Sequence, residues 1–324
     1  MTKLNKKAAL VSFIVCAVLL VLCCVGGNVS ASAAQIGAEK AASSKFAGGS
    51  GTASDPYLIS NETQLLAVNN NLTAHYRLTN NIALSNYEWI PIGGYFNGSE
   101  SDVFNGTLDG NGYSISNLQR YSDITVKNDR IYFGMFSRIG SSGVVKNLTM
   151  SNCKISMAGP DVNNSKLRVF VGAIAGSVRG IISNVSVNGT INYDIQANGM
   201  SYVGSVAGAA YAARVTNCTN HAAITSGRYS GGAGGIAGHS AYTTFNSCAN
   251  YGKIIAKCTT WGGSAAAGGI VGELYQNNVQ NWWDYFVSCY SSESLLSTSH
   301  FSWGPNPHEY TGQHYAAPSP YEYY

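Results

Sequence analysis

The stretch Gly234-Gly-Ile-Ala-Gly238 recurs with small changes along the chain and decides the fold. Each copy is a glycine-flanked apolar pair, and successive copies begin 38, 32, 30 and 34 residues apart. The five copies span Gly134–Arg138, Gly172–Gly176, Gly204–Gly208, Gly234–Gly238 and Gly268–Gly272. Self-similarity at a period of 20 to 50 residues is typical of stacked repeats, so the repeat sets the architecture.

A second landmark follows the first glycine of each copy by twelve or thirteen residues. It reads Asn147-Leu148, Asn184-Val185, Asn217-Cys218, Ser247-Cys248 and Asn281-Trp282. Two landmarks that stay in phase across variable loops indicate a true repeat. Arg138 replaces the closing glycine in the first copy, and Trp282 breaks the size pattern in the last.

Apolar residues between the landmarks alternate with Ser, Thr and Asn, as in Ile182-Ser-Asn-Val-Ser-Val187. This period of two indicates strands, and the connections are rich in turn-forming Gly, Asn and Ser. Short strands that recur once per repeat predict an all-β, parallel β-solenoid in which each repeat is one coil. Successive coils would then stack about 4.8 Å apart.

Each landmark acquires a physical role in a solenoid, because equivalent positions lie directly above one another. Leu148, Val185, Cys218 and Cys248 would form one internal column. The asparagines before them would place amides along a turn, where they can hydrogen-bond to each other and to the backbone. Cys218 and Cys248 lie within bridging distance on adjacent coils, so they form either a disulfide or two buried thiols.

The segment before the repeats has its own signals. Asn61-Glu-Thr-Gln64 precedes an apolar run and predicts a short N-capped helix, with Gln64 as the capping-box partner. Such a helix would cover the exposed edge of the first coil. Asp109-Gly-Asn-Gly112 is a strong signal for a tight turn between strands.

Three stretches resemble secreted bacterial proteins with GLUG repeats: Gly48 to Tyr57, the Phe104-x-Gly-Thr-x-Asp-Gly-Asn-Gly-Tyr-x-Ile115 turn, and coils such as Gly268-Gly-Ile-Val-Gly272. The match covers roughly residues 46 to 290. The resemblance implies a right-handed parallel β-helix in an exported, adhesin-like protein.

Such repeats also accompany IgA-cleaving zinc peptidases. Here His308 and His314 are six residues apart, whereas two zinc ligands on one helical face are four apart. The resemblance therefore does not carry the peptidase site to this chain.

The N-terminus has the order of a secretory signal. Lys3, Lys6 and Lys7 precede an apolar run from Ala8 to Val25, and small residues follow up to a cleavage site after Ala33. The alternative is an uncleaved N-terminal membrane anchor. We therefore divide the chain into a signal peptide (1–33), a linker (34–45), an N-terminal cap with the first coils (46–132), GLUG-type coils (133–290), and a C-terminal cap or disordered tail (291–324).

Charge excludes several classes of function. The 324 residues include 19 Lys and Arg and 16 Asp and Glu, so 11% are charged, against about 25% in typical domains. Basic and acidic residues balance from residue 34 onward, so a nucleic-acid partner is not expected. Contact with a membrane is expected only through an uncleaved signal segment.

No catalytic pattern stands out. A glycosidase needs two carboxylates about 5 to 10 Å apart, and no neighbouring coils carry them at equivalent positions. Asp123, Lys127, Asp129 and Arg130 come closest to the cluster of a lyase, but they are more typical of a solvated loop. No CxxC pair occurs, and we expect no metal and no cofactor. A polysaccharide lyase or glycosidase is the alternative to a non-enzyme.

The aromatic residues near the C-terminus suggest where a ligand could bind. Flat rings stack on sugars and are enriched at interfaces, so they form either a binding platform or a cap on the last coil. These residues are Trp282, Trp283, Tyr285 and Trp303. We predict an exported, non-enzymatic β-helix for cell-surface adhesion or extracellular binding. Its partner would be a glycan or a surface protein of a host or bacterium.

Overall fold

The structure is a computed structural model, and it describes the solenoid rather than the chain ends. The described residues are 45–85, 88–94, 102–121, 129–158, 166–194, 199–228, 230–258, 265–274, 285–292 and 295–297. They belong almost entirely to one compact unit, Phe46–Tyr324. The predicted signal peptide and cleavage site lie outside the described residues, as does most of the tail after residue 290.

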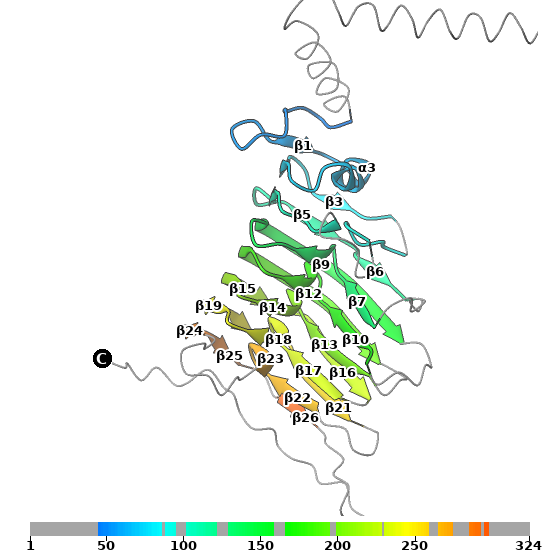
Figure 1. Ribbon diagram of the computed structural model, residues 1–324, viewed down its shortest axis with the longest axis vertical. Coiled ribbons are helices and arrows are strands. Elements are labelled where there is room, and N and C mark those ends of the chain that lie inside the picture. Colours follow the sequence, from blue (N-terminus) through cyan, green and yellow to red (C-terminus); the bar gives the residue numbers. More distant parts are fainter. Residues whose placement is uncertain are drawn as a thin grey trace, which may run out of the picture. The chain divides into compact units, whose positions relative to one another are not determined.

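The described chain forms a parallel β-solenoid, which confirms the predicted fold class. Its strands stack coil upon coil from β1 to β26 (Figure 1), and all pairings between the described strands are parallel. Each complete coil passes through two short side sheets and then through one large sheet. The two side sheets have five strands each, which gives five complete coils. The right-handed sense of the coil stays a prediction.

The first side sheet contains β7 (Arg130–Phe133), β10 (Arg168–Val171), β13 (Met200–Gly204), β17 (Ser230–Gly234) and β22 (Ala265–Gly268). The second side sheet contains β8 (Phe136–Ile139), β11 (Ala175–Val178), β14 (Ala207–Tyr211), β18 (Ala237–Ala241) and β23 (Val271–Leu274). Only two or three residues connect the two sheets within a coil, so the chain turns sharply there.

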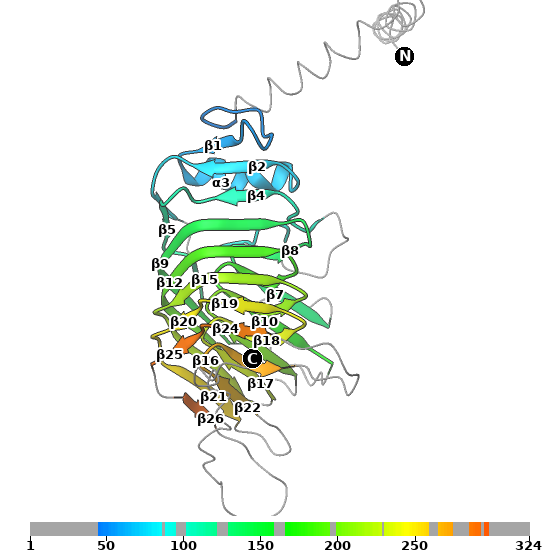
Figure 2. The ribbon, with the colours of Figure 1, turned by 90° about the vertical axis from the view of Figure 1, so that its left-hand side faces the viewer.

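The large sheet has sixteen strands, whose long members run side by side in Figure 2. The strands are β1 (Tyr57–Ile59), β2 (His75–Leu78), β3 (Ile82–Ala83), β4 (Thr107–Asp109), β5 (Ser114–Ser116), β6 (Gln119–Arg120), β9 (Val144–Ala158), β12 (Ile181–Asp194), β15 (Arg214–Asn220), β16 (Ala223–Arg228), β19 (Thr244–Asn246), β20 (Ala249–Asn250), β21 (Ile254–Cys258), β24 (Tyr285–Val287), β25 (Tyr290–Ser291) and β26 (Leu295–Ser297).

The predicted N-terminal helix is present as α3 (Glu62–Leu66), followed by the 3-10 turn η1 (Ala67–Asn70). Asn61 caps it by accepting a hydrogen bond from the Gln64 backbone N–H, as expected. The Gln64 side chain accepts from the backbone N–H of Ser60, one residue before the cap. The free edge of β1 is covered by the chain itself, because Ala47 and Gly48 hydrogen-bond to Leu58.

The first glycines of the repeat form one column at the corner between the side sheets. These residues are Gly134, Gly172, Gly204, Gly234 and Gly268. The residue predicted to replace the closing glycine in the first coil is wrong. Phe136 pairs with Ala175, so Ser137 and not Arg138 is equivalent to Gly176. The corner of the first coil is one residue shorter, and the sequence spacing hid this deletion.

The closing glycines bring two sheets into contact, with Gly238 as an example. A Cβ atom at Gly238 would lie 2.3 Å from the backbone nitrogen of Val203 in the preceding coil. Gly176, Gly208 and Gly272 make equally close approaches to the strands before them. The closing glycines are therefore required because a side chain would collide with backbone.

The sequence prediction for the second landmark of the fifth coil is wrong. Asn246 pairs with Val287, and the Cys248 carbonyl accepts from the N–H of Tyr290. Ser288-Cys289, and not Asn281-Trp282, is therefore equivalent to Ser247-Cys248. The connection after β23 is longer than in the other coils, so a fixed spacing of thirteen residues pointed to the wrong pair.

Candidate functional site

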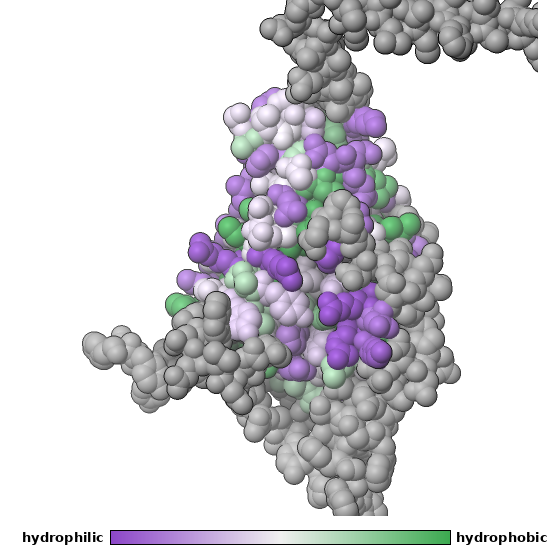
Figure 3. All heavy atoms as spheres, viewed as in Figure 1, coloured by the Kyte–Doolittle hydropathy of each residue, from purple (hydrophilic) through white to green (hydrophobic). Residues whose placement is uncertain are grey.

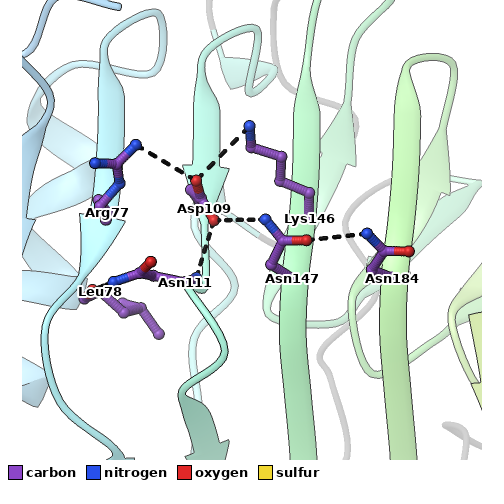
Figure 4. Close-up of polar contacts among 7 residues, drawn as sticks. All are labelled: Arg77, Leu78, Asp109, Asn111, Lys146, Asn147 and Asn184. Atoms are coloured by element: carbon purple, nitrogen blue, oxygen red, sulfur yellow. Dashed lines mark hydrogen bonds and ion pairs between the residues drawn. The ribbon is translucent and has the colours of Figure 1, made fainter. Parts of the chain in front are cut away.

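The landmark asparagines form a ladder of side chains along one turn of the solenoid (Figure 4). The amide of Asn184 donates to Asn147 at 3.0 Å, and the amide of Asn217 donates to Asn184 at 3.1 Å. All three have φ between 52° and 55°, a left-handed conformation that Asn tolerates better than most residues. This asparagine ladder therefore serves the fold, because it fixes the turn in each coil.

Asp109 ends the asparagine ladder on its N-terminal side. It accepts from the Asn147 amide at 3.0 Å, and Arg77 and Lys146 each lie 3.7 Å from its other oxygen. Burial acts to raise the pKa of Asp109, but the hydrogen bonds from Asn147 and Asn111 and the two cations outweigh it and lower the pKa. Asp109 is thus an ionised terminus of the ladder rather than a general acid.

The cysteine column of the interior contains free thiols. Cys218, Cys248 and Cys289 occupy equivalent positions of the last three coils, and none is in a disulfide. Of the two alternatives for Cys218 and Cys248, the structure has the buried thiols. Cys218 and burial together raise the pKa of Cys248 to about 12, although Cys289 opposes the rise. A thiol of this pKa is a poor nucleophile, so the column has a packing role.

The predicted aromatic platform is only partly within the described residues. Trp282, Trp283 and Trp303 lie outside them. Tyr285 begins β24, which pairs with β19 inside the fifth coil. Whether these aromatic residues form a binding platform or a cap on the last coil stays a prediction.

The predicted lyase cluster is not assembled from the described residues. Asp123 and Lys127 lie outside them, while Asp129 and Arg130 are exposed at the start of β7. No group of His, Cys, Asp or Glu with the arrangement of a metal site occurs in the described part of the chain. Nor does any described helix have the length and apolar character needed to span a membrane.

A different set of aromatic side chains is exposed on the outer surface. His221, Tyr251 and Tyr290 come from the last three coils, and their rings are successive neighbours. The first two rings stack with centroids 5.1 Å apart, and the second and third are tilted with centroids 6.0 Å apart. Tyr251 is 45% exposed and Tyr290 54% exposed. We call these three residues the outer aromatic stripe.

Two buried asparagines hold the turns that present the stripe. The Asn220 amide donates to the Asn250 carbonyl oxygen at 2.7 Å, and both residues are fully buried. Each also bonds the backbone two residues ahead, at Ala222 and Gly252. The backbone under the rings is therefore fixed by buried amide hydrogen bonds.

A sequence signal for the stripe existed. An Asn, an aromatic ring and a small residue begin two residues after Cys218 and Cys248, as Asn220-His-Ala222 and Asn250-Tyr-Gly252. The fifth coil departs from this pattern, because Ser291 is the register partner of Asn250 and Tyr290 is the partner of Ala249.

Known proteins resemble this chain in fold and over part of its sequence. A crystal structure from Bacteroides ovatus, named as a candidate immunoglobulin A1 protease, matches with a TM-score of 0.54 and 20% identity. The match covers 83% of this chain and 85% of that chain. It shows a shared fold and nothing further.

Two curated proteins are similar in sequence. Halomucin of Haloquadratum walsbyi is 35% identical over 159 residues, which is 47% of this chain and 2% of halomucin. A candidate Gly-rich membrane protein of Evansella cellulosilytica is 35% identical over 156 residues, 46% of this chain and 16% of the relative. This chain thus spans a small part of either relative. No family model matches the sequence, so the resemblance to GLUG-repeat proteins stays a prediction.

Proposed function

We propose that this chain is an exported GLUG-type β-solenoid that binds a ligand at the cell surface and does not catalyse a reaction. The observation that carries the proposal is the outer aromatic stripe. Single exposed apolar residues are ordinary on protein surfaces. Three neighbouring rings on consecutive coils are a more specific feature, since aromatic faces contact sugar rings and dominate protein interfaces.

The rigidity of the stripe supports a binding role. Binding costs less free energy when the contact surface is ordered before the ligand arrives. The buried Asn220–Asn250 pair fixes the backbone beneath the rings, so little order has to be gained on binding. One relative is named as a membrane protein, which agrees with a surface location for this chain as well. The ligand class we favour is an extracellular glycan, with a surface protein as the second possibility.

Affinity electrophoresis of the full chain in gels that contain bacterial or host polysaccharides tests the proposal. We expect retardation by at least one polymer, and at least a tenfold weaker effect when Tyr251 and Tyr290 are both changed to alanine. Tyr121→Ala is the matched control, because Tyr121 is 49% exposed and is not part of the stripe. All variants should keep the circular dichroism spectrum of the parent.

Two results would contradict the proposal. Equal retardation of the parent and the double variant would exclude the stripe as the binding surface. Degradation of the polymer, seen as a cleared zone in a glycan stain, would favour the alternative of a polysaccharide lyase or glycosidase. If no polymer retards the chain, a glycan is not the ligand.

A further inference from the structure

A second group of aromatic rings lies on the first side sheet. Tyr132, Phe170 and Tyr202 are register partners on β7, β10 and β13, with centroids 5.1 and 5.4 Å apart and nearly parallel planes. Each is only 4 to 5% exposed, and together with Ala209 they form a hydrophobic cluster. We call the three rings the aromatic stack.

Arginines surround the aromatic stack. Arg130 and Arg168 are register partners two residues before the rings of β7 and β10, so they leave the sheet on the same face as the rings. Arg138 of β8 has its guanidinium carbon 5.7 Å from the centroid of the Tyr132 ring. Figure 3 shows strongly hydrophilic side chains gathered over β7, β10 and β13.

A fourth arginine, Arg179, comes from the residue after β11. Burial raises the pKa of Tyr211 to about 12, and the charges of Arg130 and Arg179 oppose this rise. Both guanidinium groups therefore act on the same phenol, although they come from different coils. We call Arg130, Arg138, Arg168 and Arg179 the arginine cluster.

The aromatic stack ends at Gly232, which takes the position of the next ring in the register. A Cβ atom at Gly232 would lie 3.2 Å from the Cβ of Glu273. The Tyr202 hydroxyl donates a hydrogen bond to Sδ of Met200 at 3.2 Å, and burial together with the nearby Glu273 raises the pKa of Tyr202. Burial raises the pKa of Glu273, and the charge of Arg168 and the nearby Tyr202 hydroxyl oppose the rise.

The cluster is basic although the chain from residue 34 onward has no net charge. Among the described residues, Glu273 is a carboxylate that interacts with Arg168, and the exposed Asp129 directly precedes Arg130. The Nη1 atom of Arg168 is buried and has no hydrogen-bond partner among the described residues. Arg168 therefore retains an unused donor, and a buried donor without a partner costs free energy until a ligand satisfies it.

We propose that the arginine cluster binds the carboxylate groups of an acidic polysaccharide. Guanidinium groups match carboxylates with two parallel hydrogen bonds, and the packed rings hold their stems in place. The arginines lie on two consecutive coils, so a polymer with repeated carboxylates can occupy several of them at once. This site is separate from the outer aromatic stripe and does not depend on it.

The test measures binding of the full chain to polygalacturonate, with neutral dextran of similar length as the reference. The test variant changes Arg130 and Arg179 to glutamine, because both are exposed and their replacement leaves the packing intact. Arg214→Gln on β15 is the matched control, since Arg214 is an exposed arginine outside the cluster. We expect at least tenfold weaker binding for the double variant, no change for Arg214→Gln, and weaker binding as salt increases.

The Tyr251 and Tyr290 double variant separates the two proposals. We expect it to bind polygalacturonate as well as the parent does, even if its retardation by other polymers is lost. Equal binding by the parent and the arginine variant would overturn the inference, as would failure of the parent to bind polygalacturonate. Binding of a single-stranded oligonucleotide as tight as that of polygalacturonate would also overturn it, because the site would then recognise charge alone.

Discussion

The two ends of the solenoid fill the corner between the side sheets in different ways. Near the N-terminus, large rings stack through the interior, and Phe104 and Phe136 lie with centroids 4.3 Å apart. The column that contains Phe136 lies next to Ile92 of the preceding coil and continues through small residues in the later coils. These residues are Ala175, Ala207, Ala237 and Val271.

This difference separates what the fold requires from what it tolerates. The closing glycines recur because a Cβ atom would meet backbone, and the ladder asparagines recur because the turn needs positive φ. The interior column between them varies from Phe to Ala, because neighbouring side chains can supply the missing volume. The backbone thus imposes the landmarks, whereas packing constrains only the total volume.

The largest expected effect is the loss of stability when a buried ring is removed near the N-terminal end of the solenoid. Phe104→Ala removes a fully buried ring, and we expect a loss of about 3–5 kcal/mol in the free energy of unfolding. Cys248→Ala, which trims a small side chain at the other end, should cost about 1 kcal/mol. Urea unfolding measures both, and similar losses would contradict the contrast between the ends.

The next largest effect is the loss of stability at acidic pH. Burial lowers the pKa of His239 to about 4, against about 6.5 in the unfolded chain. The contribution of neutral His239 to the free energy of unfolding is fully present above pH 6.5. It falls as the pH drops toward 4, because His239 takes up a proton more readily in the unfolded chain than in the folded one. We expect a loss of about 2–3 kcal/mol across this window.

Variants of His239 and Asp109 test which residue causes the loss of stability in each part of the acidic pH range. His239→Gln should flatten the dependence of unfolding free energy between pH 6.5 and 4. The lowered pKa of Asp109 means that its contribution is lost only as the pH falls below the ordinary carboxyl range, about 3.9. Asp109→Asn should therefore change only the most acidic part of the curve. An unchanged curve between pH 6.5 and 4 for His239→Gln would refute the assignment.

A smaller effect tests the closing glycines. Gly238→Ala should cost about 1–3 kcal/mol, since the new methyl group collides with the backbone of the preceding coil. Ser137→Ala is the control, because the equivalent position in the first coil already accommodates a side chain. Thermal unfolding measures the melting temperature of both variants, and we expect the lower value for Gly238→Ala. Equal melting temperatures would argue against close approach at Gly238.

The smallest effect tests the asparagine ladder. Asn184→Ala removes two side-chain hydrogen bonds and strains a backbone with φ of 54°, for an expected loss of about 1 kcal/mol. Asn184→Gly removes the same bonds but accepts the backbone conformation, so it should be the milder variant. If glycine is the more damaging of the two, relief of the positive φ at this position is not what limits stability.

The sequence was sufficient for the fold class but not for every register. Repeated glycines and Asn-x pairs predicted the solenoid, because the backbone imposes them in each coil. The short corner at Ser137 and the long connection before Ser288 could not be predicted, since only strand pairing shows where a loop gains or loses residues.

The binding surfaces were harder to predict than the fold. The arginine cluster comes from two consecutive coils and four separate positions of the chain, so no contiguous motif marks it. The outer aromatic stripe has a local motif in two coils only, and Tyr290 joins the stripe from the position that Ala249 holds in the preceding coil, which strand pairing alone shows.

The register of the last coils is the most direct test of this account. Cysteines at equivalent positions of adjacent coils lie about 4.8 Å apart, within the range for a disulfide. In a Cys218→Ala variant, mild oxidation of the folded chain followed by peptide mass mapping should find Cys248 linked to Cys289. A Cys289 that links to another cysteine while Cys248 remains reduced would contradict the stacking of the fifth coil on the fourth.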